Sequence, residues 1–209
     1  MMANSENGSI GQSKMLMIVQ LGVLMTIMVV LYFTGIGNFS LSFGLSEMQI
    51  TIMMIPVIIG AITLGPIVGM ILGVLFGLSE VFSPASQPLM EVNMWAVVGL
   101  NIAVRGIGLG ALCGGMFKLL RKIDKSKVWS YEATGLVTVL LNTLITVGGL
   151  VLIFGANPEN IGFPDGMAMS AMFSFFITAV GVQTIVEALI CTLAASIAAK
   201  AIVVYLYKN

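Results

Sequence analysis

The chain has 209 residues, of which 58% are hydrophobic and only 9% charged, whereas soluble domains carry about a quarter charged residues. This composition excludes a water-soluble globule and predicts a polytopic membrane protein. The absence of histidine excludes a Ser-His-Asp triad and zinc sites built on imidazole, and the nine basic and nine acidic residues favour no polyanionic partner such as nucleic acid. No metal or cofactor is expected.

Apolar segments follow one another along nearly the whole chain. Residues 1–14 are polar and are predicted to form a short cytoplasmic tail, followed by a single membrane domain over residues 15–209. The first apolar run ends near Phe33, and its length of roughly 20 residues is enough to cross a membrane. The other predicted spans cover residues 49–64, 66–82, 95–118, 133–154 and 171–199.

The 32 uncharged residues between Glu47 and Glu80 are too many for one crossing. As a single helix they would be roughly 48 Å long, against a hydrocarbon core of about 30 Å. Gly65-Pro66 supplies a break, because proline disfavours a helical residue before it and lacks a backbone donor. The segment Gly35–Glu47 before this run is predicted to be an outer connecting loop.

The placement of charges supports six transmembrane helices. With a cytoplasmic N-terminus, eight of the nine basic residues fall on the cytoplasmic side, as the positive-inside rule requires. They are Lys14, Lys118, Arg121, Lys122, Lys125, Lys127, Lys200 and Lys208. The outer connections carry acidic residues and no lysine or arginine, namely Glu47, Glu80, Glu91, Glu159 and Asp165. We therefore expect an all-α polytopic protein of the plasma membrane with both termini cytoplasmic.

Small residues recur at helical spacing in three of the predicted spans. Gly65, Gly69, Gly73 and Gly77 repeat every four residues, and Gly106, Gly110 and Gly114 do the same. Such stripes allow close backbone approach and predict tight packing within the protein. In the first span, Gly22 and Thr26 form one small pair, for which internal packing and docking of a partner helix are both open.

Polar residues inside the spans predict a ligand pocket near the membrane midplane. Arg105 lies roughly 15 Å below the outer end of its span, and Asn142 and Gln183 lie roughly 18 Å deep on two other helices. Because burying an arginine in a membrane is costly, a compensating group is expected. Asn101, one turn outward of Arg105, is either a further pocket residue or an interhelical hydrogen-bonding group.

Glu187 lies one turn beyond Gln183 and on the same helix face. Two interpretations remain open at this stage. In the first, Glu187 and Arg105 form a structural ion pair. In the second, Arg105 contacts a ligand directly, and Glu187 is free to contact the ligand as well.

The stretch ITIMMIPVIIGAITLGPIVGMILGVLFGLSEVF, residues 50–82, resembles the second and third spans of substrate-binding S components of energy-coupling factor (ECF) vitamin transporters, most closely the pantothenate type. The resemblance extends to Arg105, Asn142 and the block GVQTIVEALI, residues 181–190. Met54 stands where a histidine is expected in the pantothenate type, and Gln183 where an asparagine is common. The resemblance implies a six-helix subunit that binds a vitamin from outside and delivers it by toppling. It also implies a transmembrane T component and two ATPases as partners, with Gly22 and Thr26 as the docking pair.

Pantothenate is the ligand expected from this resemblance, with Arg105 neutralising its carboxylate and Asn142, Gln183 and Asn101 facing its hydroxyl and amide groups. Riboflavin-type and hydroxymethylpyrimidine/pyridoxine-type ligands are alternatives. A stand-alone ion-coupled carrier that uses Glu187 is another. The chain has no phosphate-binding GxxxxGK[ST] pattern and is not expected to be an enzyme, so ATP hydrolysis would belong to partner subunits.

Overall fold

The computed structural model describes residues 3–43, 46–84, 86–124, 129–155, 159 and 166–207. Side chains are described from Lys14 onward, except those at 39–49, 179 and 205–207. The helices are α1 (Ala3–Thr34), α2 (Met54–Thr63), α3 (Pro66–Val81), α4 (Gln87–Val98), the π-helix η1 (Gly99–Gly108), α5 (Leu109–Ile123), α6 (Trp129–Phe154) and α7 (Met169–Tyr207). The strands are β1 (Asn38–Phe43) and β2 (Ser46–Thr51).

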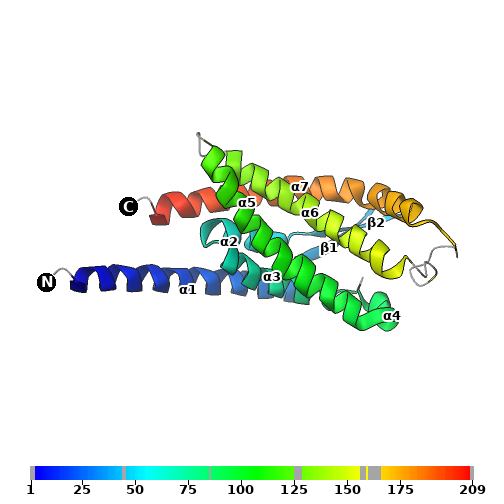
Figure 1. The fold of residues 1–209 in the computed structure, drawn as a ribbon, viewed down its shortest axis with the longest axis horizontal. Coiled ribbons are helices and arrows are strands. Elements are labelled where there is room, and N and C mark those ends of the chain that lie inside the picture. The colour runs from blue at the N-terminus through cyan, green and yellow to red at the C-terminus, as the bar shows by residue number, and fades with distance from the viewer. Residues whose placement is uncertain are drawn as a thin grey trace.

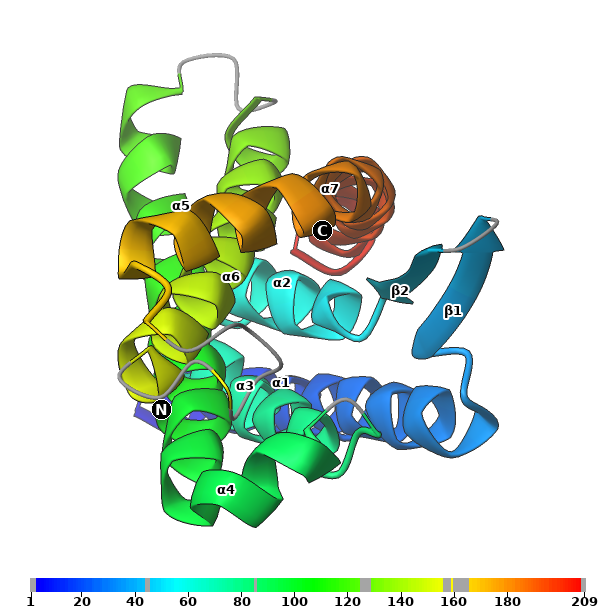
Figure 2. The same cartoon turned by 90° about the vertical axis from the view of Figure 1, so that its right-hand side faces the viewer.

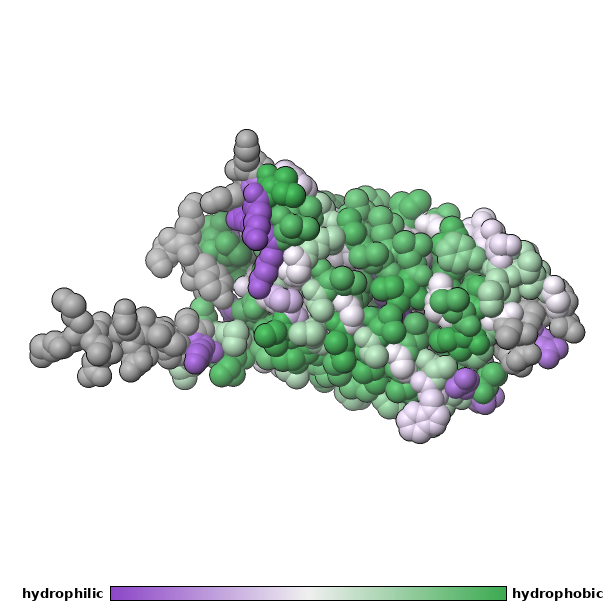
Figure 3. Space-filling view, in the orientation of Figure 1, coloured by the Kyte–Doolittle hydropathy of each residue, from purple (hydrophilic) through white to green (hydrophobic). Residues whose placement is uncertain are grey.

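Four of the described helical segments are long and apolar enough to cross a membrane. They are Lys14–Thr34, Gln87–Ile123, Trp129–Phe154 and Val180–Val204. Helices α2 and α3 are apolar but shorter, at 10 and 16 residues. The surface agrees with a membrane protein, because hydrophobic residues cover its middle while hydrophilic residues gather toward the two ends (Figure 3). The helical membrane class is confirmed, whereas six crossings remain a prediction.

The start of α1, the end of α7, the end of α5 and the start of α6 all lie at the same end of the elongated molecule (Figure 1). Arg121 and Lys122 occupy the last turn of α5 next to the α5–α6 connection. Lys125 and Lys127 in the connection, and Lys208, lie outside the described residues. This arrangement is the one that an even number of crossings produces.

A β-hairpin replaces the loop predicted at Gly35–Glu47 and the start of the span predicted at residue 49. Strands β1 and β2 pair antiparallel, with Asn38 opposite Thr51. The segment 38–51 contains β-branched residues and places a polar residue at most alternate positions, which suits a strand better than an apolar helix. As a result α2 begins at Met54, and Figure 2 shows the hairpin at the edge of the helix bundle.

The fourth predicted span is longer than expected and changes its winding. Helices α4, η1 and α5 form one apolar segment over Gln87–Ile123, interrupted by a kink at Asn93 where φ is −152° and ψ is 83°. The π-helical part η1 contains both Asn101 and Arg105. π-Helical segments are rare, but those that do occur are often found at functional sites. The π-helical winding therefore marks this part of the helix as a candidate functional segment.

The glycine stripes pack against each other, which confirms the prediction of tight internal contact. A Cβ added at Gly69 would lie 2.6 Å from the carbonyl oxygen of Gly110, and one at Gly73 would collide with the Gly106 carbonyl. A Cβ at Gly114 would lie 2.5 Å from the Cα of Pro66. Helix α3 is therefore in backbone contact with η1 and α5 over its whole length.

Candidate ligand-binding site

A cavity of about 360 Å³ lies among β2, α3, η1, α6 and α7. This volume falls within the range of small-molecule sites, about 300–1,000 Å³. Its polar lining residues are Thr51, Glu80, Ser83, Ser86, Asn101, Arg105, Asn142, Thr143, Thr146, Gln183, Thr184 and Glu187. All four residues predicted to bind substrate, Asn101, Arg105, Asn142 and Gln183, therefore line one cavity.

Arg105 is the best-connected group in the cavity and is only 7% exposed. Its Nε donates to Asn142 Oδ1 at 3.1 Å, and its Nη1 donates to Asn101 Oδ1 at 2.6 Å. The guanidinium carbon also lies 5.3 Å from the ring centre of Phe76, within cation–π range. These contacts from α3 and α6 hold the guanidinium in a fixed orientation inside the bundle.

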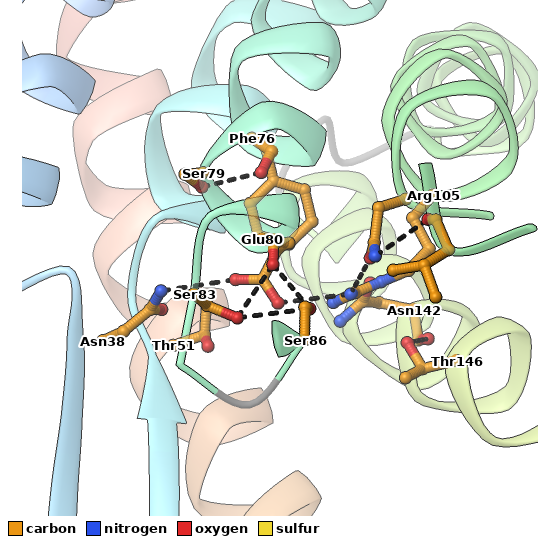
Figure 4. Close-up of polar contacts among 12 residues, drawn as sticks. Asn38, Thr51, Phe76, Ser79, Glu80, Ser83, Ser86, Arg105, Asn142 and Thr146 are labelled. Atoms are coloured by element: carbon orange, nitrogen blue, oxygen red, sulfur yellow. Dashed lines mark hydrogen bonds and ion pairs between the residues drawn. The ribbon is translucent and has the colours of Figure 1, made fainter. Parts of the chain in front are cut away.

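The carboxylate that pairs with Arg105 belongs to Glu80, in the last turn of α3. Glu80 Oε2 lies 3.2 Å from Arg105 Nη1, and Figure 4 shows the guanidinium between Glu80 and Asn142. Of the two interpretations left open by the sequence, the Arg105–Glu187 ion pair is not formed, and Arg105 pairs with Glu80 instead. Glu80 lies in the last turn of α3, within the predicted span 66–82, and not in the connection that follows it.

A signal for Glu80 was present in the sequence. Gly73 and Gly77 lie on the α3 face that contacts the helix carrying Arg105, and Glu80 follows Gly77 by three residues. Residues three apart lie on the same helix face, so Glu80 points toward that neighbouring helix too. The three-residue spacing from Gly77 therefore indicated that Glu80 faces the helix that carries Arg105.

Glu187 lies on the opposite wall, on α7, and is 4% exposed. Its Oε1 accepts hydrogen bonds from the Thr51 backbone N–H at 2.8 Å and from Gln183 Nε2 at 3.2 Å. Gln183 and Glu187 thus share a face, as their four-residue spacing predicts. Among the residues that the structure describes, neither partner is a cation.

The β-hairpin contacts both carboxylates of the cavity through its open end, where Asn38 and Thr51 lie opposite each other. At the start of β1, Asn38 Nδ2 donates to Glu80 Oε1 at 3.3 Å. At the end of β2, Thr51 donates its backbone N–H to Glu187 and its carbonyl accepts from the Cys191 thiol. The sequence did not predict this link, because it depends on pairing between residues far apart in the chain.

Three residues that the sequence singled out lie away from the cavity, namely Met54, Gly22 and Thr26. Met54 is 1% exposed and packs in the apolar core, so the methionine at this position does not change the cavity wall. Gly22 is on the exposed side of α1, and a Cβ added there would meet no atom within 4 Å. Thr26 Oγ1 donates to the Gly22 carbonyl at 2.9 Å. This small pair is therefore open to the outside of the bundle.

Comparison with known proteins identifies the family of this chain. The model of the family described as "ECF transporter, substrate-specific component" matches residues 16–199. Comparison with curated proteins finds no match. The matched range includes every residue that lines the cavity and the exposed small pair on α1.

Proposed function

The chain belongs to the family of ECF transporter substrate-specific components, and from this premise we propose that it binds a B vitamin outside the plasma membrane and delivers it inward. The family implies a small-molecule substrate and a transmembrane and ATPase module as partners. A single observation carries the proposal for this chain. A cavity lined by a buried arginine and several amides and hydroxyls lies inside an otherwise apolar helix bundle.

We propose six membrane crossings with both termini cytoplasmic. Helices α2 and α3, about 15 and 24 Å long, would form the second and third crossings. Support comes from the common location of the start of α1, the end of α7, the end of α5 and the start of α6, which is the basic side of the sequence (Figure 1). The residues 1–14 would form the cytoplasmic tail, although the helical backbone of α1 already begins at Ala3.

Pantothenate is the ligand candidate that the sequence resemblance alone supplies. Its carboxylate would contact Arg105, with its hydroxyl and amide groups near Asn142, Gln183 and Asn101. Arg105 Nη1 already donates to Glu80 and Asn101, so the ligand carboxylate would share the guanidinium with Glu80 or displace it. Riboflavin receives no support from the cavity, because no aromatic side chain is among its described lining residues.

An amine-bearing ring ligand of the hydroxymethylpyrimidine/pyridoxine type is the second candidate. The specific observation in its favour is that two carboxylates, Glu80 and Glu187, line the cavity against one arginine. Amino groups and protonated ring nitrogens donate hydrogen bonds to carboxylates and need not displace either one from its present partners.

The proposal is tested with the full chain purified in detergent. We expect one B vitamin to bind tightly in calorimetry, and uptake into proteoliposomes to require ATP together with the T component and the two ATPases. Uptake by the chain alone, abolished by Glu187→Gln, would instead support the ion-coupled carrier. ATP hydrolysis by the purified chain alone would contradict its assignment as a non-enzymatic subunit.

A further inference from the structure

We infer that the transported ligand presents a positively charged nitrogen to Glu187, so the cavity selects amine-bearing molecules over monoanions. This inference rests on the proposed function, because it assumes that the cavity holds the transported molecule. It concerns the α7 wall of the cavity, opposite Arg105, which the sequence left without a defined role.

The first argument is the charge balance among the described lining residues. Only three of them carry a full charge when ionised, namely Glu80, Arg105 and Glu187. Glu80 and Arg105 neutralise each other across 3.2 Å. With all three ionised, the net charge of these lining residues is minus one, because Glu187 has no ion-pair partner among the described residues.

The second argument is the environment of Glu187. Both donors that reach it, the Thr51 N–H and the Gln183 amide, are neutral, and both contact Oε1. No donor in the described ranges contacts Oε2, although the side chain lines the cavity and is 4% exposed. A buried carboxylate without a cation is costly, so a ligand that brings the cation recovers part of this cost on binding.

The third argument compares the two ligand classes. A monoanion raises the charge in the cavity to minus two, and its carboxylate competes with Glu80 for Arg105. A monocation brings the charge to zero and leaves the Arg105–Glu80–Asn38 contacts in place. With no aromatic ring among the described lining residues, the cation is recognised by the carboxylate and not by cation–π contact.

The first test needs no ligand. Glu187→Gln keeps an oxygen that can accept the Thr51 and Gln183 hydrogen bonds but removes the unbalanced charge, so we expect the melting temperature of the ligand-free chain to rise by about 2 °C or more. The matched control is Glu80→Gln in the same cavity, which leaves Arg105 without its counter-ion and should lower the melting temperature. A lower melting temperature for Glu187→Gln would mean that Glu187 is a structural residue, and this overturns the inference.

The second test uses pyridoxamine and pyridoxine, which differ by an ammonium in place of a hydroxyl, with pantothenate as the anionic probe. We expect the wild-type chain to bind pyridoxamine about tenfold or more tightly than either of the others, and Glu187→Gln to remove the preference. Tighter binding of pantothenate, no preference within the pair, or a preference that survives Glu187→Gln each overturns the inference. Failure of the proposed function is recognised separately, by the absence of ATP-dependent vitamin uptake in the complete transporter.

Discussion

Glu80 and Arg105, 25 residues apart in the sequence, meet inside the bundle with 3.2 Å between Oε2 and Nη1. The contact joins the end of α3 to the π-helix η1. A carboxylate near a helix C-terminus interacts unfavourably with the negative end of the helix dipole. The positive charge of Arg105 compensates for this unfavourable interaction at Glu80. The pair thus connects the helix packing to the polar wall of the cavity.

Removal of Arg105 should destabilise the chain through Glu80. Arg105→Ala leaves a buried carboxylate without its cation, and breaking such a pair costs about 3–5 kcal/mol. Thermal unfolding in detergent should show a large loss for Arg105→Ala and partial recovery in Arg105→Ala/Glu80→Ala. Arg105→Ala/Glu187→Ala is the matched control, and greater recovery in this variant would show that Glu187 is the energetic partner.

Recognition of the pantothenate carboxylate would be a second role of Arg105, separate from its pairing with Glu80. If the vitamin places its carboxylate on the guanidinium, Arg105→Ala should weaken binding by about 2–5 kcal/mol, or roughly 30- to 4,000-fold in Kd. Arg105→Lys should restore only part of this, because lysine lacks the planar fork. Calorimetry with the neutral alcohol analogue is the control, since its affinity should be similar in wild type and Arg105→Ala. An equal loss for acid and alcohol would contradict carboxylate recognition.

The contact between α3 and α5 should be intolerant of a single methyl group. Gly69→Ala places a Cβ 2.6 Å from the Gly110 carbonyl and 2.8 Å from the Cβ of Ala61. Overpacking of this kind costs about 1–3 kcal/mol, which should lower the melting temperature by several degrees. Gly115→Ala is the control on α5, because a Cβ at this position meets no described atom within 4 Å. Equal melting temperatures for the two variants would contradict the close packing.

Docking of the T component on α1 is tested by added bulk. Gly22→Leu or Thr26→Leu should reduce ATP-dependent uptake while vitamin binding stays unchanged, because both residues face outward and neither lines the cavity. Ile27→Phe adds bulk at an exposed position about 140° around the helix from Gly22 and about 100° from Thr26, and it should leave uptake intact. A parallel loss of binding and uptake in Gly22→Leu would contradict docking at this face.

Depth along the helices was enough to predict that three polar residues share the cavity. Arg105, Asn142 and Gln183 come from three helices, and a rise of 1.5 Å per residue placed them at similar levels before any contact was known. The same count failed for the second span, because residues 46–51 pair with β1 instead of continuing the helix. Strand pairing depends on a partner elsewhere in the chain, which periodicity within one segment does not show.

The partner of Arg105 was missed for a different reason. Counting charges grouped Glu80 with the outer connections, although the predicted span 66–82 contains it, and charge counting does not show which side chain a residue in the last turn of α3 contacts. The π-helical winding of η1 also had no sequence signature. It depends on how the helix fits against its neighbours, and local propensity does not encode that fit.

The close approach of Gly77 on α3 to the backbone of η1 sets the position of the Arg105 side chain, which Gly77 does not contact. A Cβ there would lie 2.9 Å from the Cα of Ile102 and would collide with the Asn101 carbonyl. Any larger residue would push η1 outward and carry the Arg105 guanidinium with it, away from Asn142. The spacing of two main chains therefore fixes how wide the cavity is, while the side chains on its walls determine what it recognises. Lining residues can be exchanged to change ligand preference without altering that width, provided that Gly77 is kept.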